Sequence, residues 1–153
     1  MTAGSGHAIS EEVLNIIKEH LPSGKTILEF GSGTGTHMLV AAGYKMVSVE
    51  QDFRFVNYSA PIAEMIFAPI DPATNWYNMN IVNAAIKNLE YDAILIDGPG
   101  PGDRFGIINS KADLTKLIFV DDIDRPYDRE LFDVLSKVGE REVIDHKFFG
   151  VIK

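Results

Sequence analysis

Hydrophobic positions along the chain form two kinds of run, and their order predicts strands alternating with helices. Short apolar runs of strand length occur at five places, and segments with apolar residues at helical spacing lie between them. The predicted strands are 26–30, 45–49, 64–70, 91–96 and 117–120. The predicted helices are 10–21, 37–42, 81–89 and 127–138, with a short helix or turn at 53–58.

The end of the chain departs from this alternation. Residues 140–146 and 148–153 are predicted to pair as an antiparallel hairpin around a tight turn. The whole order indicates an α/β fold: a doubly wound, Rossmann-like, mostly parallel sheet with helices on both faces. At 153 residues we expect a single domain over 1–153, in which 1–8 form a flexible lead-in.

The first predicted strand runs directly into glycines at alternate positions, Gly31, Gly33 and Gly35. Glycine takes positive φ freely and lets a ligand approach the backbone, while a following helix offers unpaired N–H groups. A dinucleotide fingerprint needs G-x-G-x-x-G, and here Thr36 follows the third glycine. A nicotinamide-dependent reductase is therefore the weaker hypothesis for a nucleotide-type site at this loop. A glycine-rich turn that binds nothing is another alternative.

Acidic residues follow two of the predicted strands. Glu50 stands about 20 residues after the first loop glycine, where a carboxylate can hold the two vicinal hydroxyls of a ribose. Gln51 lies beside it. Asp97 follows the fourth strand, and ligands of open α/β sheets bind outside the carboxyl ends of strands. Glu50 and Asp97 are thus predicted to face one site.

Two further segments carry candidate chemistry. The loop 71–77 contains Trp76 and Tyr77, for which core packing is favoured over a role in covering a ligand. Asp121 and Asp122 follow the fifth strand, where acids at a helix start would be unremarkable. Facing Asp97, however, they would either share protons or bind a hard divalent cation through oxygen. Mg²⁺ or Mn²⁺ would be the expected ion at Asp97, Asp121 and Asp122.

Charge and composition narrow the classes of partner. The net charge is −8, with 14 basic against 22 acidic residues, so a nucleic-acid substrate is disfavoured and a small neutral or cationic one is favoured. The absence of cysteine excludes disulfides, thiolate zinc sites and cysteine nucleophiles. No apolar run approaches the ~20 residues of a membrane span, and the start lacks a signal-peptide pattern. We therefore expect a cytoplasmic protein.

The segment Glu29-x-Gly31-x-Gly33-x-Gly35 resembles the first motif of class I S-adenosylmethionine (SAM) dependent methyltransferases. With acids after the second and fourth strands, the likeness extends over most of the chain. It implies that the glycine loop contacts the methionine part of SAM, and that Glu29 lies near the amino group. The cofactor-binding residues so implied are Glu29, Gly31, Ser32, Gly33, Gly35, Glu50, Gln51 and Asp97.

A narrower likeness points to a reaction. The segments 30–33, 96–99 with Arg104, and 119–126 are similar to the plant glucuronoxylan 4-O-methyltransferase (DUF579) group, although Asp121 replaces its usual His. The likeness implies O-methyl transfer to a hydroxyl of a small molecule or sugar. Asp97 would be the base or metal ligand, Asp122 its partner, and Arg104 an orienter of the acceptor together with Arg125.

One alternative comes from the size of the chain, which carries no cap domain to build an acceptor pocket. The protein would then be a SAM-binding module without catalytic activity. A second copy of the chain could instead complete an open site, so a homodimer is a testable addition.

Overall fold

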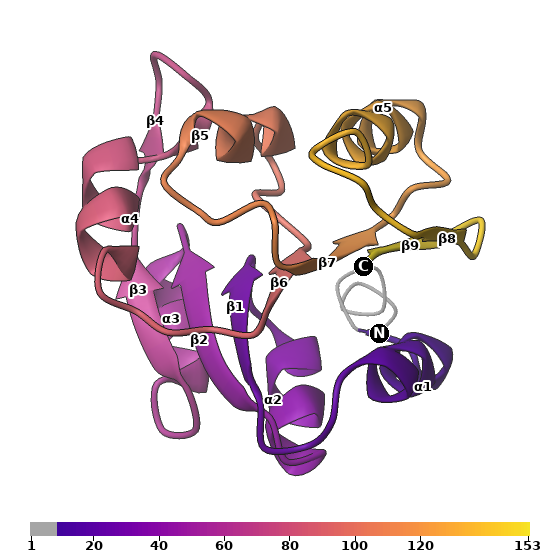
Figure 1. Cartoon of the computed structure of the whole chain (residues 1–153). Coiled ribbons are helices and arrows are strands. Elements are labelled where there is room, and N and C mark those ends of the chain that lie inside the picture. The colour runs from indigo at the N-terminus through magenta and orange to yellow at the C-terminus, as the bar shows by residue number, and fades with distance from the viewer. Residues whose placement is uncertain (1–8) are drawn as a thin grey trace.

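A mostly parallel sheet of seven strands forms the centre of the molecule (Figure 1). The computed structural model describes residues 9–153, so the predicted flexible lead-in at 1–8 lies outside the described residues. The sheet order is β3-β2-β1-β6-β7-β9-β8. Its strands are β1 (Thr26–Phe30), β2 (Lys45–Glu50), β3 (Glu64–Phe67), β6 (Ala93–Ile96), β7 (Leu117–Asp121), β8 (Val143–Asp145) and β9 (Phe149–Ile152).

The first five strands in space run parallel, and β9 and β8 close one edge as an antiparallel pair. This confirms the predicted sheet and its terminal hairpin. Strand order reverses between β1 and β6, because β1 leads outward to β2 on one side and β6 leads to β7 on the other. In open α/β sheets a crevice forms outside the carboxyl ends of the strands at such a point.

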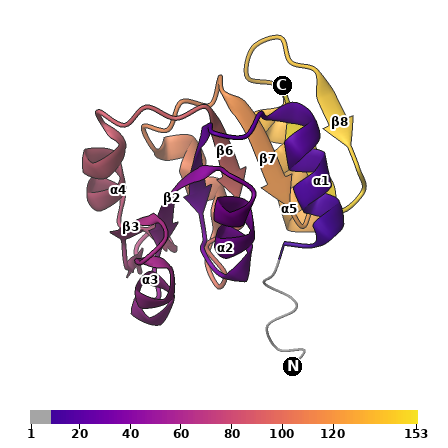
Figure 2. The same cartoon turned by 90° about the horizontal axis from the view of Figure 1, so that it is seen from below.

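Helices cover both faces of this sheet (Figures 1 and 2). Helices α1 and α2 pack on one face of the sheet over one apolar cluster. Helices α4 and α5 pack on the other face over a second apolar cluster. The sequence fixes α1 locally, since the Ser10 side chain accepts a hydrogen bond from the Val13 N–H at 3.2 Å. The helices are α1 (Glu11–His20), α2 (Thr34–Ala41), α3 (Phe53–Ser59), α4 (Met79–Ile86) and α5 (Pro126–Leu135).

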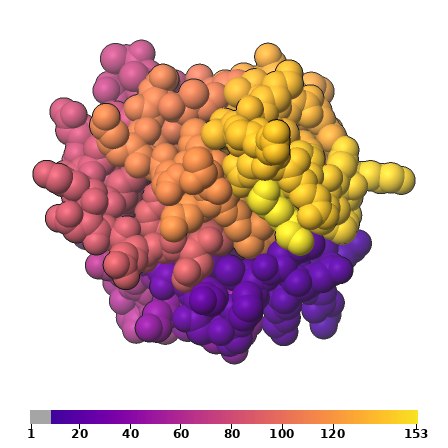
Figure 3. Space-filling model, in the orientation of Figure 1, coloured from indigo at the N-terminus to yellow at the C-terminus, as the bar shows by residue number. Residues whose placement is uncertain are grey.

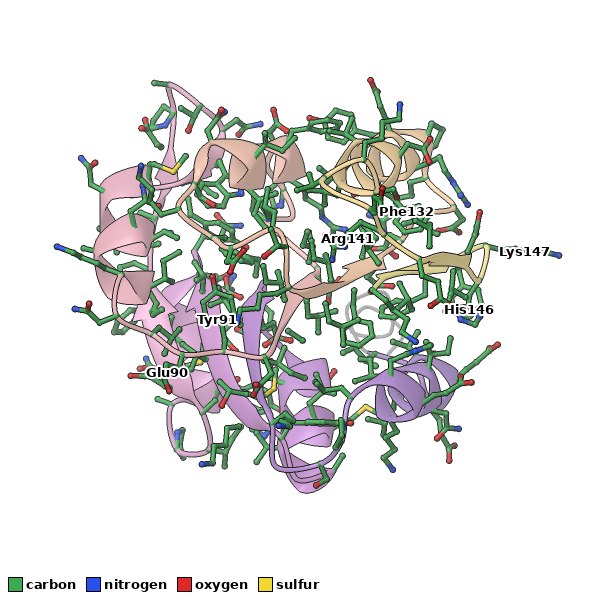
Figure 4. All side chains as sticks on the ribbon, viewed as in Figure 1. Glu90, Tyr91, Phe132, Arg141, His146 and Lys147 are labelled. Carbon is green, nitrogen blue, oxygen red and sulfur yellow. The ribbon has the colours of Figure 1, made fainter. Side chains whose placement is uncertain are left out.

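Two side chains labelled in Figure 4, Arg141 and Phe132, hold the C-terminal strands against neighbouring segments. The Arg141 guanidinium donates to the backbone carbonyls of Leu114 at 2.7 Å and Lys153 at 2.9 Å. Gly150 of β9 admits the Phe132 ring, because a Cβ there would lie 2.3 Å from the ring. On the face shown in Figure 3 the last residues, in yellow, meet the indigo N-terminal segment.

Two segments differ from the sequence prediction. The strand expected at 64–70 ends at Phe67, and the expected loop 71–77 is a two-stranded hairpin, β4 (Ile70–Asp71) and β5 (Trp76–Tyr77). After β6 the chain forms a 3-10 helix, η2 (Arg104–Asn109), which the glycine- and proline-rich sequence did not predict. Both additions lie toward the α4 and α5 side of the sheet (Figure 1).

Among the described helices, none combines the length and the apolar character needed to cross a membrane.

Candidate cofactor site

The backbones of β1 and β6 touch just beyond their carboxyl ends. Gly31 has φ +92°, and a Cβ on it would lie 2.8 Å from the carbonyl oxygen of Asp97. A Cβ on Gly98 would lie 2.9 Å from the Gly31 Cα. Only glycine fits at this contact, because a side chain on either residue would collide with backbone. The crossing leaves bare backbone at the point where strand order reverses.

Glu50 holds the glycine loop from the neighbouring strand. Its Oε1 accepts hydrogen bonds from the Ser32 N–H at 3.0 Å and the Ser32 hydroxyl at 2.9 Å. Its Oε2 accepts from the Asp52 N–H at 2.8 Å. The carboxylate is therefore fixed between the loop after β1 and the start of α3, and it lines the cleft described below.

Glu29 lies beneath the loop and away from the cleft. Its side chain is 1% exposed, and Oε1 accepts hydrogen bonds from the hydroxyls of Thr36 at 2.6 Å and Ser48 at 2.7 Å. Burial raises its pKa from 4.5 to about 7, against the lowering effect of those two hydrogen bonds. In this structure Glu29 supports the start of α2 and does not line the cleft, and its place near the amino group of SAM stays a prediction.

The other two loop glycines also face inward. Gly33 caps α2, and its N–H donates to the Thr36 hydroxyl oxygen at 3.1 Å. Gly35 packs against Ile9, whose side chain would lie 2.6 Å from an added Cβ. Gly33 and Gly35 therefore shape the loop and its packing, while Gly31 and Ser32 line the cleft.

Asp97 pairs with Asp121 across β6 and β7. Burial raises the pKa of Asp97 well above its usual range, and the negative charge of Asp121 and a hydrogen bond to it act in the same direction. The pKa of Asp121 is also raised by burial, although the hydrogen bond from Asp97 opposes that rise. Two neighbouring buried carboxyl groups disfavour the doubly ionised state, so the pair gives up its last proton less readily than an isolated carboxyl group would.

Arg104, at the start of η2, is buried among carboxylates. Its guanidinium lies 3.4 Å from Asp122, 3.3 Å from Asp128 and 3.9 Å from Asp97. It also donates to the Asp97 carbonyl at 3.1 Å. Arg104 thus positions the acidic groups from β6, β7 and α5. Arg125 contacts the same carboxylate, at 3.5 Å from Asp122, but its side chain is 58% exposed, against 9% for Arg104.

The carboxylates of Asp97, Asp121 and Asp122 can present oxygens within 4.8 Å of one another. This is the set predicted to bind a divalent cation. The donor set is hard oxygen and suits Mg²⁺ or Mn²⁺. Asp122 already contacts the Arg104 guanidinium, so a positive charge stands at this cluster without a metal.

Tyr77, at the end of β5, contributes a group that the sequence analysis assigned to packing. Its ring packs near Phe30 and Trp76, with centroid distances of 6.0 Å and 5.2 Å. Its hydroxyl is buried and has no hydrogen-bond partner among residues 9–153. A two-residue strand in a hairpin gave no pattern from which this placement could be predicted.

These groups surround a cleft of about 190 Å³ at the carboxyl ends of β1, β2 and β6. The predicted residues Gly31, Ser32, Glu50, Gln51, Asp97, Arg104 and Asp122 all line it, whereas Glu29, Gly33, Gly35 and Asp121 do not. Residues that the analysis of the sequence did not assign to the site are Phe55, Tyr77, Pro99, Gly100 and Pro101. Most of the predicted residues thus line one cleft. Glu29, Gly33 and Gly35 instead shape the glycine loop beside it.

The fold is shared with three solved structures, two of which are described as methyltransferases. A TehB-like SAM-dependent methyltransferase from Corynebacterium glutamicum superposes with a TM-score of 0.58 at 17% identity, over 99% of this chain and 90% of that one. The C-terminal domain of precorrin-6Y C5,15-methyltransferase from Rhodobacter capsulatus gives 0.52 at 15% identity, over 92% and 81%. A fibrillarin/Nop5p complex gives 0.51 at 15%, over 94% and 79%.

At these identities the likeness defines the fold, which is that of class I methyltransferases. No family model matches the chain, and no curated protein matches it in sequence. The narrower resemblance to the glucuronoxylan 4-O-methyltransferase group therefore rests on its three sequence segments alone.

Proposed function

We propose that the protein is a SAM-dependent methyltransferase that transfers a methyl group to a hydroxyl of a small molecule or sugar. One observation carries the cofactor assignment: the Glu50 carboxylate and the bare backbone of Gly31 line a single cleft where strand order reverses. A carboxylate suits the ribose hydroxyls, and the glycine contact suits a ligand that lies against backbone. The shared fold with SAM-dependent methyltransferases supports this choice over a nicotinamide cofactor.

The residues present fit such a ligand. Gly31 and Ser32 would hold the methionine part, Glu50 the ribose, and Gln51 with Phe55 the adenosine end of the cleft. Bound SAM supplies an electrophilic methyl group on a sulfonium. The protein has to exclude water, align the acceptor oxygen with that methyl group, and receive the hydroxyl proton.

The Asp97–Asp121 pair is the proposed proton acceptor. As the new carbon–oxygen bond forms and the carbon–sulfur bond breaks, the hydroxyl proton passes to the pair. Arg104 keeps Asp97 in place through the carbonyl contact at 3.1 Å. Because burial raises the pKa of Asp97, the transfer rate should increase as the pH rises through that raised value.

The first test is calorimetric titration of the purified protein with SAM, with and without Mg²⁺, followed by the same titration of Glu50→Ala. We expect the unaltered protein to bind SAM and the Glu50→Ala variant to lose that binding. Glu50→Ala also removes the hydrogen bonds to Ser32, so its thermal unfolding is measured beside it. NADH that binds more tightly than SAM would instead support a nicotinamide-dependent reductase, and the absence of SAM binding would refute the proposal.

A second test separates an enzyme from a SAM-binding module. Asp97→Asn should abolish methyl transfer while SAM affinity is largely kept, since the change removes the proton acceptor and little volume. Turnover that survives in Asp97→Asn would contradict the role of Asp97. A protein that binds SAM but transfers methyl to no member of a hydroxyl acceptor panel, and shows no slow hydrolysis of SAM, would be a binding module.

The same assay of methyl transfer can test whether the reaction needs a metal ion. If Asp97, Asp121 and Asp122 bind Mg²⁺ or Mn²⁺, chelator should lower the transfer rate and the added ion should restore it. Transfer that is unchanged in chelator would leave Arg104 as the cation of the cluster. A homodimer and a cytoplasmic location stay predictions from the sequence, and light scattering measures the first.

A further inference from the structure

The Tyr77 hydroxyl is a buried donor with no partner among the described residues. The side chain is 0% exposed, and burial raises its pKa well above the usual value, so the hydroxyl keeps its proton at any physiological pH. Leaving such a group unpaired costs free energy that a folded protein usually avoids. An unpaired hydroxyl in a cleft wall therefore marks a place where a bound ligand supplies the missing acceptor.

The position of this hydroxyl in the site is well defined. Tyr77 lines the cleft together with Gly31, Asp97 and Arg104. The hydroxyl oxygen lies against Gly98, where an added Cβ would approach it to 2.6 Å. Gly98 in turn touches Gly31, so the hydroxyl lies over the crossing of the β1 and β6 backbones. It is thus beside the glycine loop.

We propose that the Tyr77 hydroxyl donates a hydrogen bond to the α-carboxylate of the methionine part of SAM. This inference rests on the proposed function, which places the methionine part at the glycine loop. The charged groups that act on Tyr77 are Glu50, Arg104, Asp97 and Glu29. The raised pKa values of Glu29 and Asp97 and the positive charge of Arg104 reduce the negative charge around the hydroxyl, and the phenol supplies a donor that stays protonated.

Access to the hydroxyl requires a small displacement of the segment that covers it. Gly98 lies against the hydroxyl, and the following residues are rich in glycine and proline. A Cβ on Gly100 would meet no atom within 4 Å, so Gly100 faces open space on that side, two residues beyond the contact of Gly98 with the hydroxyl. The phenol then exchanges a buried, unpaired state for a charge-assisted hydrogen bond.

The test compares SAM with decarboxylated S-adenosylmethionine, which lacks only the carboxylate. The protein and its Tyr77→Phe variant are each titrated with both ligands by calorimetry. We expect the unaltered protein to bind SAM more tightly than the decarboxylated ligand. Tyr77→Phe should weaken SAM binding about 10- to 100-fold, the loss expected for one hydrogen bond to a charged group. The affinity for the decarboxylated ligand should change by less than about twofold.

A stability measurement separates this role from a structural one. Tyr77→Phe removes an unpaired polar atom, so the ligand-free variant should unfold at the same or a higher temperature than the unaltered protein. Tyr44→Phe is the matched control, because the Tyr44 hydroxyl donates to the Leu21 carbonyl at 2.6 Å and does not line the cleft. That variant should unfold at a lower temperature and keep its affinity for SAM.

Each other outcome overturns the inference. If Tyr77→Phe weakens the binding of both ligands equally, or of neither, the hydroxyl does not contact the carboxylate. An ordered water paired with the hydroxyl would give the second of these results. If the unaltered protein binds no SAM, the proposed function fails and this inference with it, whereas an unchanged ratio of affinities overturns the inference alone.

Discussion

Replacement of Glu29 by Gln should change how the stability of the protein depends on pH. Burial raises the pKa of this side chain from 4.5 to about 7, so the folded state binds the proton more tightly than the unfolded chain does. The stability that Glu29 contributes is complete below the unfolded pKa and is lost as the pH rises through about 7. The shift corresponds to about 3 kcal/mol of unfolding free energy.

Gln is a close replacement because its side-chain oxygen can still accept from the hydroxyls of Thr36 and Ser48. Glu29→Gln should therefore lack the loss of stability at high pH. We expect the difference in unfolding free energy between the variant and the unaltered protein to grow by about 3 kcal/mol from low to high pH. In melting temperature this is a relative gain of about 6–12 °C for a chain of this size.

The assay is thermal and urea unfolding of both proteins at about one-unit steps of pH, in the absence of ligand. Taking the difference between the two curves removes most of the contribution of Asp97 and Asp121, which titrate in both proteins. The part of the Asp97 pKa rise that comes from the Glu29 charge, the smallest of its causes, remains in the difference. A difference that does not vary with pH would refute the reasoning. It would mean that the two hydroxyls solvate the ionised Glu29 well enough to offset its burial.

Outcomes are also expected for four further variants. Gly98→Ala should lower the free energy of unfolding in urea by about 1–3 kcal/mol, since its Cβ would lie 2.6 Å from the Tyr77 hydroxyl. Gly100→Ala should leave urea unfolding unchanged, because its Cβ would meet no atom within 4 Å. Arg104→Met should cost about 3–5 kcal/mol by the same measurement, because it leaves buried carboxylates without their cation. Arg54→Met, which breaks an exposed ion pair, should have no measurable effect, and equal losses in the two arginine variants would contradict this account.

Much of the fold could be predicted because its signals are local. The apolar runs of the central strands and the glycines after β1 define a parallel sheet with a loop at its carboxyl edge. From that edge it follows that Glu50 and Asp97 face one site, as the structure shows. Element ends were less predictable: α2 begins at Thr34, before the expected residue 37.

The positions of the side chains within the site could not be predicted from the sequence in the same way. Strand β1 is buried on both faces, so no alternation of polarity shows that Glu29 points beneath the loop. Asp122 has φ +61°, which turns the chain as it leaves β7. Asp97 and Asp121 each follow a residue of the register pair Ile96–Val120, so Asp121 is the nearer partner in the sheet and the one that acts on the pKa of Asp97. The contacts of Arg104 join segments that are 18 and 24 residues apart, and nothing local in the sequence indicates them.

The hydrogen bonds of Glu50 set a limit on what it can recognise. A carboxylate offers about four lone-pair positions, and the three donors from Ser32 and Asp52 leave one free, on Oε2. Only one of two vicinal hydroxyls can therefore bind Glu50 while the loop keeps its present form. The two hydroxyls of a ribose should thus be unequal here: removal of one should weaken binding, and removal of the other should have little effect.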